Sequence, residues 1–190
     1  MNSGTIELTP EERTSLLRLA RGTIEGYLRE GRVPEPRDLG IRITPGLRVI
    51  AGAFVTLHED GELRGCIGEI EPERELYRAV RDHALNAAFK DPRFRPLTPA
   101  ELPRIVIEIS ALTPPVEAHS WRDIEIGRHG VVLSKAGRRA VFLPQVAPEQ
   151  GWNVETMLDY LAMKAGLPRD AWREGARFEV FEAVVFGEKD

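Results

Sequence analysis

The sequence predicts an α+β fold, a mostly antiparallel sheet flanked by helices. Three observations support this class. Apolar residues recur at helical spacing in three segments, apolar and polar residues alternate in others, and the repeated strand–helix–strand rhythm of a parallel sheet is missing. With 190 residues, 42% of them hydrophobic, the chain is long enough to bury a core without disulfides. We therefore expect a single domain over residues 1–190.

The first expected element is a helix that begins after Thr9. Thr9 suits the N-cap, Pro10 suits the first helical position, and the acidic residues that follow suit the positive end of the helix dipole. Apolar residues then recur at helical spacing as far as Leu28, and Gly31 ends the segment. This pattern predicts one buried helical stripe.

A β-hairpin is expected next. Residues 49–57 form an apolar, β-branched run, and Asp60-Gly61 favours a type I′ turn. Residues 63–67 form the returning strand. Because alternate residues of a strand share a face, Arg64 and Cys66 are expected to project together.

A second helix is expected to begin at Pro72 and to end at Asp91-Pro92, with His83 on its surface. Residues 105–112 alternate as in a strand. The face of that strand that carries Glu108 is either covered, in which case the carboxylate needs a partner, or open to solvent.

The last third of the sequence predicts a second hairpin, a helix and a strand. Residues 131–143 form the hairpin, with a turn at residues 136–138. Asn153 caps the helix, which ends at Gly166, and residues 178–186 alternate through one last strand.

Composition narrows the functional classes. A net charge of −4 argues against nucleic acid and anionic membranes as partners. A single cysteine cannot form an intramolecular disulfide, and no apolar run reaches the roughly 20 residues of a membrane span. Met1–Thr5 lacks the basic start of a signal peptide. These features predict a cytoplasmic protein.

Cys66 is the first candidate for chemistry. A guanidinium at Arg64 would favour its thiolate, and Gly65 and Gly68 remove side chains beside it, which permits close approach by a ligand or a bulge. The alternative is that a lone cysteine is a small buried hydrophobe.

A nucleophilic cysteine needs a base, and His129 is the foremost of four histidines because it lies in a glycine-flanked turn. The alternative for His129 is an exposed turn residue. Asp91 and Arg93, in a loop stiffened by prolines, and Glu108 complete the set of candidate binding residues. One cysteine and four scattered histidines lack the spacing of metal ligands, so no metal site is expected.

These candidates lie in segments that resemble a known family. The segments are Gly52-Ala53-Phe54-Val55-Thr56-Leu57, Gly61-Glu62-Leu63-Arg64-Gly65-Cys66-Ile67-Gly68, Asp91-Pro92-Arg93-Phe94-Arg95-Pro96-Leu97, Gly127-Arg128-His129-Gly130, Phe142-Leu143-Pro144-Gln145-Val146 and Trp152. Together they resemble the signature of the AMMECR family, over nearly the whole chain.

The resemblance implies an α+β fold with a larger and a smaller subdomain, and places residues 63–68 near their junction. It names no activity and no cofactor. Prokaryotic members resemble the first component of the AmmeMemoRadiSam set, which groups this domain with a Memo-type protein and a radical SAM protein.

Two functional classes therefore stand open. The first is an enzyme or substrate-binding component of a modification pathway, with a cleft at residues 63–68. Cys66 and His129 would be catalytic there, and Arg64, Gly65, Gly68, Asp91, Arg93 and Glu108 would bind substrate. The second is a noncatalytic interaction module whose partners are Memo-type and radical SAM proteins.

Overall fold

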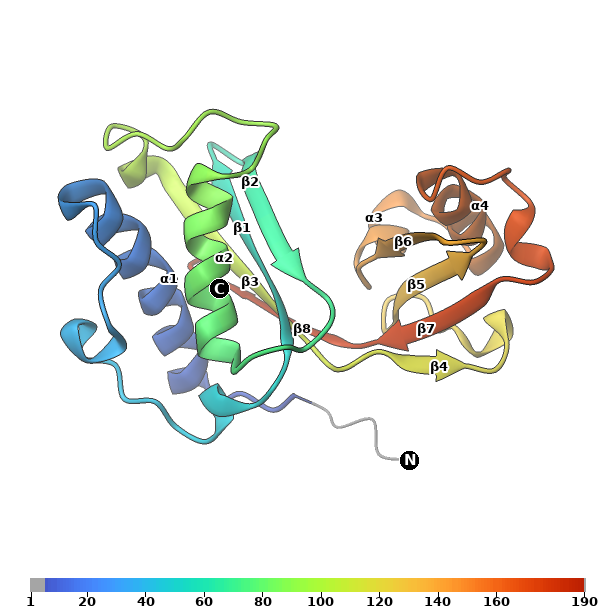
Figure 1. Cartoon of the computed structure of the whole chain (residues 1–190), viewed down its shortest axis with the longest axis horizontal. Coiled ribbons are helices and arrows are strands. Elements are labelled where there is room, and N and C mark those ends of the chain that lie inside the picture. Colours follow the sequence, from blue (N-terminus) through green and yellow to red (C-terminus); the bar gives the residue numbers. More distant parts are fainter. Residues whose placement is uncertain (1–5, 190) are drawn as a thin grey trace. The chain divides into compact units, whose positions relative to one another are not determined.

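The structure is a computed structural model that describes residues 6–189, and these divide into two compact units (Figure 1). The main unit comprises residues 6–112 and 184–189, and the insert unit comprises residues 113–183. The segment Met1–Thr5, on which the signal-peptide prediction falls, lies outside the described residues. Within residues 6–189, no helix is both long and apolar enough to cross a membrane.

The main unit is a four-stranded sheet with two helices packed on one face (Figure 1). Its helices are α1 (Pro10–Glu30) and α2 (Leu76–Phe89), and its strands are β1 (Gly52–Glu59), β2 (Glu62–Glu69), β3 (Ile105–Leu112) and β8 (Ala183–Gly187). The strand order is β2-β1-β3-β8, and β1 runs antiparallel to β2 and to β3. The α+β prediction is confirmed.

The two faces of this sheet differ in burial. On β1, Ala53, Val55 and Leu57 are fully buried within the hydrophobic core that includes the helices. The residues between them, such as Phe54 and Thr56, are only partly buried. We call these the core face and the open face.

The predicted ends of α1 and the predicted turn are confirmed. Thr9 accepts a hydrogen bond from the Glu12 backbone N–H, and the Glu12 side chain accepts one from the Thr9 backbone N–H, so both form a capping box. Gly31 ends the helix in the left-handed conformation. In the β1–β2 hairpin, Asp60 and Gly61 both have positive φ, as a type I′ turn requires.

Two predictions for α2 are wrong. The helix begins at Leu76 rather than at Pro72, because the preceding residues form a bridge, Ile50 with Glu75, at the side of the sheet. His83 is also buried rather than on the surface, since it lies on the same helical stripe as Val80 and Ala84.

The insert unit is a second four-stranded sheet, in the order β4-β7-β5-β6. Its elements are β4 (Val116–Ala118), β5 (Gly130–Lys135), β6 (Arg138–Phe142), α3 (Val146–Gln150), α4 (Val154–Lys164) and β7 (Arg177–Phe181). Its core contains Leu133, Leu158, Trp172 and Phe178. The predicted Asn153 cap of α4 is confirmed, because the Asn153 side chain accepts a hydrogen bond from the Thr156 backbone N–H.

The prediction of one last strand over residues 178–186 is wrong. The chain forms β7, interrupts the pairing at Glu182, and continues as β8, so the two strands belong to different sheets. The residue alternation continues across the break, and for that reason the pattern cannot reveal it. The insert unit is thus inserted between β3 and β8 of the main unit.

Candidate functional site

Cys66 lies in a row of three polar side chains on the open face of the main sheet. On the neighbouring strand Thr56 is the partner of Cys66, and on the next strand Glu108 is the partner of Thr56. The Thr56 hydroxyl donates a hydrogen bond to the Cys66 Sγ at 3.3 Å. Strands lie about 4.8 Å apart, so the row places a thiol, a hydroxyl and a carboxylate within about 10 Å. All three residues are partly exposed.

A β-bulge is what directs Cys66 to this face. Near the turn His58 pairs with Leu63, but the next pair is Leu57 with Gly65, so Arg64 is an extra residue on β2. Without the bulge, Cys66 would pair with Val55, which points into the core. The shift by one residue places Cys66 opposite Thr56 instead. The prediction that Arg64 and Cys66 project from the same face of the strand is therefore wrong.

The backbone of Cys66 is held by the loop that follows α2. Asp91 accepts a hydrogen bond from the Cys66 N–H at 2.9 Å, and the Arg93 guanidinium donates one to the Cys66 carbonyl oxygen at 3.3 Å. Both backbone groups belong to β2, which is an edge strand. Asp91 and Arg93 thus satisfy the edge of the sheet where a further strand would bind.

Asp91 and Arg93 also bind each other. The Arg93 Nη2 and Nε lie 2.7 and 2.9 Å from the two carboxylate oxygens. The Asp91 side chain is 1% exposed, and the hydrogen bond from Arg93 holds its pKa well below the usual range of an aspartate. The pKa of Arg93 is raised, chiefly by that hydrogen bond. Arg93 is therefore the arginine whose guanidinium contacts Cys66, through the carbonyl oxygen of that residue.

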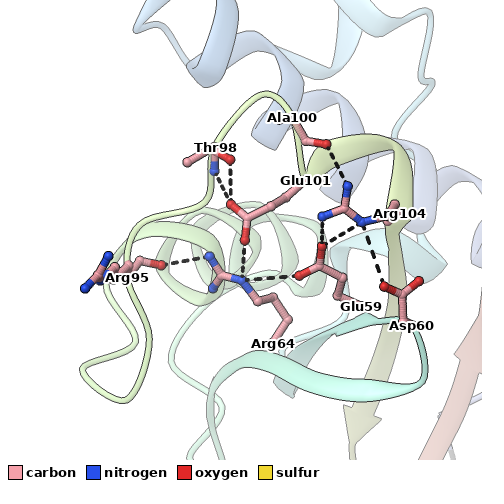
Figure 2. A network of polar contacts seen from close by, with 8 residues as sticks. All are labelled: Glu59, Asp60, Arg64, Arg95, Thr98, Ala100, Glu101 and Arg104. Carbon is pink, nitrogen blue, oxygen red and sulfur yellow. Dashed lines mark hydrogen bonds and ion pairs between the residues drawn. The ribbon is translucent and has the colours of Figure 1, made fainter.

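Figure 2 shows that Arg64 instead ties the hairpin to the loop of residues 91–101. Its guanidinium donates to Glu101 at 2.8 Å and to the carbonyl oxygen of Arg95 at 2.9 Å. Glu101 also accepts two hydrogen bonds from Thr98. The hydrogen bond from Arg64 is the main cause that lowers the pKa of Glu101 to about 2. These contacts give Arg64 a structural role, and substrate binding by Arg64 stays a prediction.

The two glycines of the motif are explained by internal packing. A Cβ at Gly65 would collide with the carbonyl oxygen of Ala87 in α2. A Cβ at Gly68 would collide with the ring of Phe54. The close approach expected at these glycines is thus made by the protein itself, and binding of a substrate by Gly65 and Gly68 stays a prediction.

Glu108 differs from the other carboxylates near the motif. The open face around it is partly covered, because Glu108 is half-buried and Ser110, two residues on, is 2% exposed. Within the described part of the chain, its side chain has no hydrogen bond and no ion pair, whereas Asp91 and Glu101 are both paired with arginines. Among the described residues, Glu108 is therefore the carboxylate of the row without a polar partner, and it can bind a ligand.

His129 belongs to the insert unit. Its backbone N–H donates to the Glu125 carbonyl oxygen, and its Nδ1 accepts a hydrogen bond from the Glu125 backbone N–H at 3.1 Å. These bonds close the turn before β5, and because Nδ1 is an acceptor, the neutral ring carries its proton on Nε2. That His129 lies beside Cys66 stays a prediction. So does the expected cleft at residues 63–68.

Metal binding receives no support from the side chains that the structure describes, because residues 6–189 hold no group of three or more His, Cys, Asp or Glu placed to share an ion.

Sequence reasoning missed Thr56 and Glu101. Thr56 could have been suspected, since counting back from the Asp60-Gly61 turn places it opposite Gly65, one residue from Cys66. The bulge, which moves it opposite Cys66, has no sequence signal of its own. Glu101 lies far from the motif in sequence, and only the path of the loop brings it to Arg64.

Comparisons with known proteins agree on one family. The AMMECR1 family model matches residues 17–186. Protein Mbar_A1807 of Methanosarcina barkeri is 41% identical, over 96% of this chain and 93% of its own length. Protein MJ0810 of Methanocaldococcus jannaschii is 42% identical, over 95% and 92%. The crystal structure of protein PH0010 from Pyrococcus horikoshii is 38% identical with a TM-score of 0.82, and the match covers 92% of this chain and 90% of that one.

Proposed function

The chain belongs to the AMMECR1 family, and from that premise we propose that it is a cytoplasmic enzyme or substrate-binding component of a modification pathway, with Cys66 at the centre of its site. The observation that carries the proposal is the row of Cys66, Thr56 and Glu108 on the open face of the main sheet. An ionised thiol is a nucleophile, a hydroxyl can donate to it, and an unpaired carboxylate accepts protons or binds cationic groups.

The surroundings of the row support a site rather than simple packing. The bulge at Arg64 places Cys66 on the partly exposed face, although the ideal register would place it in the core. The Asp91–Arg93 pair fixes the Cys66 backbone. A nucleophile needs such a rigid frame, because a misplacement of about 1 Å reduces reactivity strongly.

The proposal assigns separate roles to the remaining candidates. Glu108 lies two strands, or about 10 Å, from Cys66 and would bind a cationic group of the substrate. His129, the base that the sequence suggested, would act as a donor through Nε2, because its Nδ1 accepts the Glu125 N–H. Arg93 would add positive charge beside the sulfur, since its guanidinium already binds the Cys66 carbonyl oxygen.

An interaction module is the second candidate, with Memo-type and radical SAM proteins as partners. An edge strand such as β2 is the usual place for strand addition by a partner. At Cys66, however, Asp91 and Arg93 occupy the backbone groups that such a partner would need. This occupation favours the first candidate at the motif itself.

The test is the rate at which Cys66 is alkylated by iodoacetamide in the native protein, between pH 6 and 9. We expect Thr56→Val to slow alkylation at neutral pH by about fivefold, the equivalent of one lost hydrogen bond of about 1 kcal/mol. Thr44→Val serves as the control, because Thr44 is a threonine of the same unit with no contact to the thiol. A thiol that reacts only in denaturant would contradict the proposal.

A third variant, Cys66→Ala, tests whether the site binds a small molecule. Thermal-shift screening against a metabolite pool should reveal compounds that stabilise the wild type and that fail to stabilise Cys66→Ala. If the only binding detected is to Memo-type or radical SAM proteins, and it survives Cys66→Ala, the interaction module is the better account.

A further inference from the structure

A second polar row lies on the insert unit, away from the residues of the proposed function in sequence. Ser134 on β5 pairs with Arg139 on β6 and with Arg177 on β7. Residues paired across antiparallel strands share a face, so Ser134 lies between two arginine residues on one face of the sheet. The outer two Cα atoms are about 10 Å apart, from twice the strand spacing.

A groove runs beside this row. Its volume is about 370 Å³, and its lining includes the row itself together with Lys135 and Arg138. A second groove, of about 220 Å³, also contains Ser134 and Arg177 in its lining. The two grooves therefore share Ser134 and Arg177.

Two of the cations that line the larger groove bind carbonyl oxygens rather than carboxylates. Lys135 donates to the carbonyl oxygens of Ala171 and Glu174, both at 2.7 Å, and Arg138 donates to the carbonyl oxygen of Gly166. Carbonyl groups fix the geometry of a cation without cancelling its charge. The ends of these two side chains are thus held in place and remain charged.

The two arginines of the row differ in their partners. Arg139 lies 3.4 Å from the carboxylate of Glu179, an ion pair between partly exposed groups. Arg177 is exposed, and within residues 6–189 its side chain has neither a hydrogen bond nor an ion pair. Of the described residues that line the larger groove, none is acidic. Four cationic side chains thus gather here in a protein whose net charge is −4.

We propose that this groove binds a phosphate group carried by a small molecule. Guanidinium groups bind phosphate through paired hydrogen bonds, and a hydroxyl between them can donate to a third oxygen. In this arrangement Arg177 and Ser134 contact the phosphate directly, Arg139 closes the other side, and Lys135 and Arg138 supply the surrounding positive field. This site is independent of the proposed function at Cys66.

The observations favour a small ligand over a nucleic acid. A nucleic acid needs a positive surface that follows several phosphates, whereas here the cations line one short groove. The neighbouring row of the same sheet face pairs Glu117 with Glu179, and these carboxylates would repel a second phosphate.

The experiment is a titration of the ¹⁵N-labelled protein with inorganic phosphate and with phenyl phosphate, followed by NMR, with sodium chloride at equal ionic strength as the reference. We expect saturable shifts in residues 134–139 and 175–177. Arg177→Gln should weaken binding about tenfold or more, the loss of a charge-assisted contact. Ser134→Ala should weaken it less and leave the spectrum otherwise unchanged.

The control is Arg37→Gln, in the main unit, whose side chain is 87% exposed and whose nearest carboxylate lies 3.9 Å away. This variant should bind phosphate like the wild type. Shifts that do not saturate, that sodium chloride reproduces, or that Arg177→Gln leaves intact would overturn the proposal. So would tighter, length-dependent binding of a single-stranded oligonucleotide, which would make the groove part of a nucleic-acid surface.

Discussion

Replacement of Asp91 by asparagine tests how the motif is held. The carboxylate accepts four hydrogen bonds, from the Cys66 N–H and from three nitrogens of Arg93. Asparagine keeps one acceptor oxygen, but its NH2 group replaces the other oxygen and faces N–H groups that need an acceptor. At least one backbone N–H, that of Cys66 or of Arg93, therefore loses its partner.

The magnitude follows from which groups water can satisfy. The Arg93 side chain is 54% exposed, so its guanidinium regains water and contributes little to the loss. The backbone N–H is part-buried and regains water less easily, and an unsatisfied buried donor costs about 1 to 3 kcal/mol. The remaining hydrogen bonds also weaken, because the acceptor is no longer charged. We therefore expect Asp91→Asn to lower the free energy of unfolding by about 2 to 3 kcal/mol.

The assay can separate the two units. All three tryptophans, Trp121, Trp152 and Trp172, lie in the insert unit, whereas the two longest helices, α1 and α2, lie in the main unit. In urea unfolding, circular dichroism at 222 nm therefore reports mainly on the main unit, and tryptophan fluorescence reports on the insert unit. Asp91→Asn should shift the unfolding transition that circular dichroism follows to lower urea concentration.

Two results would refute this reasoning. One is a change below about 0.5 kcal/mol, the size expected of the control Asp60→Asn, whose carboxylate is 77% exposed. The other is a wrong pH dependence. The folded pKa of Asp91 is lowered, so its contribution is present above the unfolded pKa of about 3.9 and is lost as the pH falls through the folded value. The difference between wild type and variant should stay constant above pH 5 and shrink only in stronger acid.

Three further predictions concern the packing of the main unit and the independence of the fold from metal ions. Gly65→Ala forces a Cβ against the Ala87 carbonyl oxygen and should lower the free energy of unfolding by about 1 to 3 kcal/mol in urea titrations. A free energy of unfolding equal to that of the wild type would contradict this packing. Burial lowers the pKa of His83, so the folded protein favours the neutral imidazole; its contribution to stability is present above pH 6.5 and is lost as the pH falls through the folded pKa. His83→Leu should flatten the curve of stability against pH in that range. An unaltered curve would contradict this reasoning. Treatment with EDTA should leave both unfolding transitions in place, and the disappearance of either would reveal a structural metal.

Local signals predicted the elements of the fold well. The capping box at Thr9, the Asp60-Gly61 turn and the Asn153 cap each depend on a few neighbouring residues, and all three appear where the sequence places them. Such features follow from backbone chemistry that acts within one turn of chain.

The failures all depend on distant contacts. The bulge at Arg64 changes the face of Cys66, but a bulge is fixed by what its strand packs against, here the Ala87 backbone and Glu101. His83 is polar, yet the position of α2 on the sheet buries it. The directions in which Arg64 and Cys66 point could therefore not be predicted from the sequence, and the roles of the candidate site residues stay predictions.

The insertion of one unit between β3 and β8 also has a consequence for synthesis. The ribosome makes β3 before the whole insert unit and makes β8 only afterwards. Until β8 emerges, β3 is an unprotected edge on the nascent chain, and the insert unit is free to fold first from residues that are contiguous in sequence. A stop codon anywhere in the last strand would thus leave the insert unit intact and damage the sheet that carries Cys66.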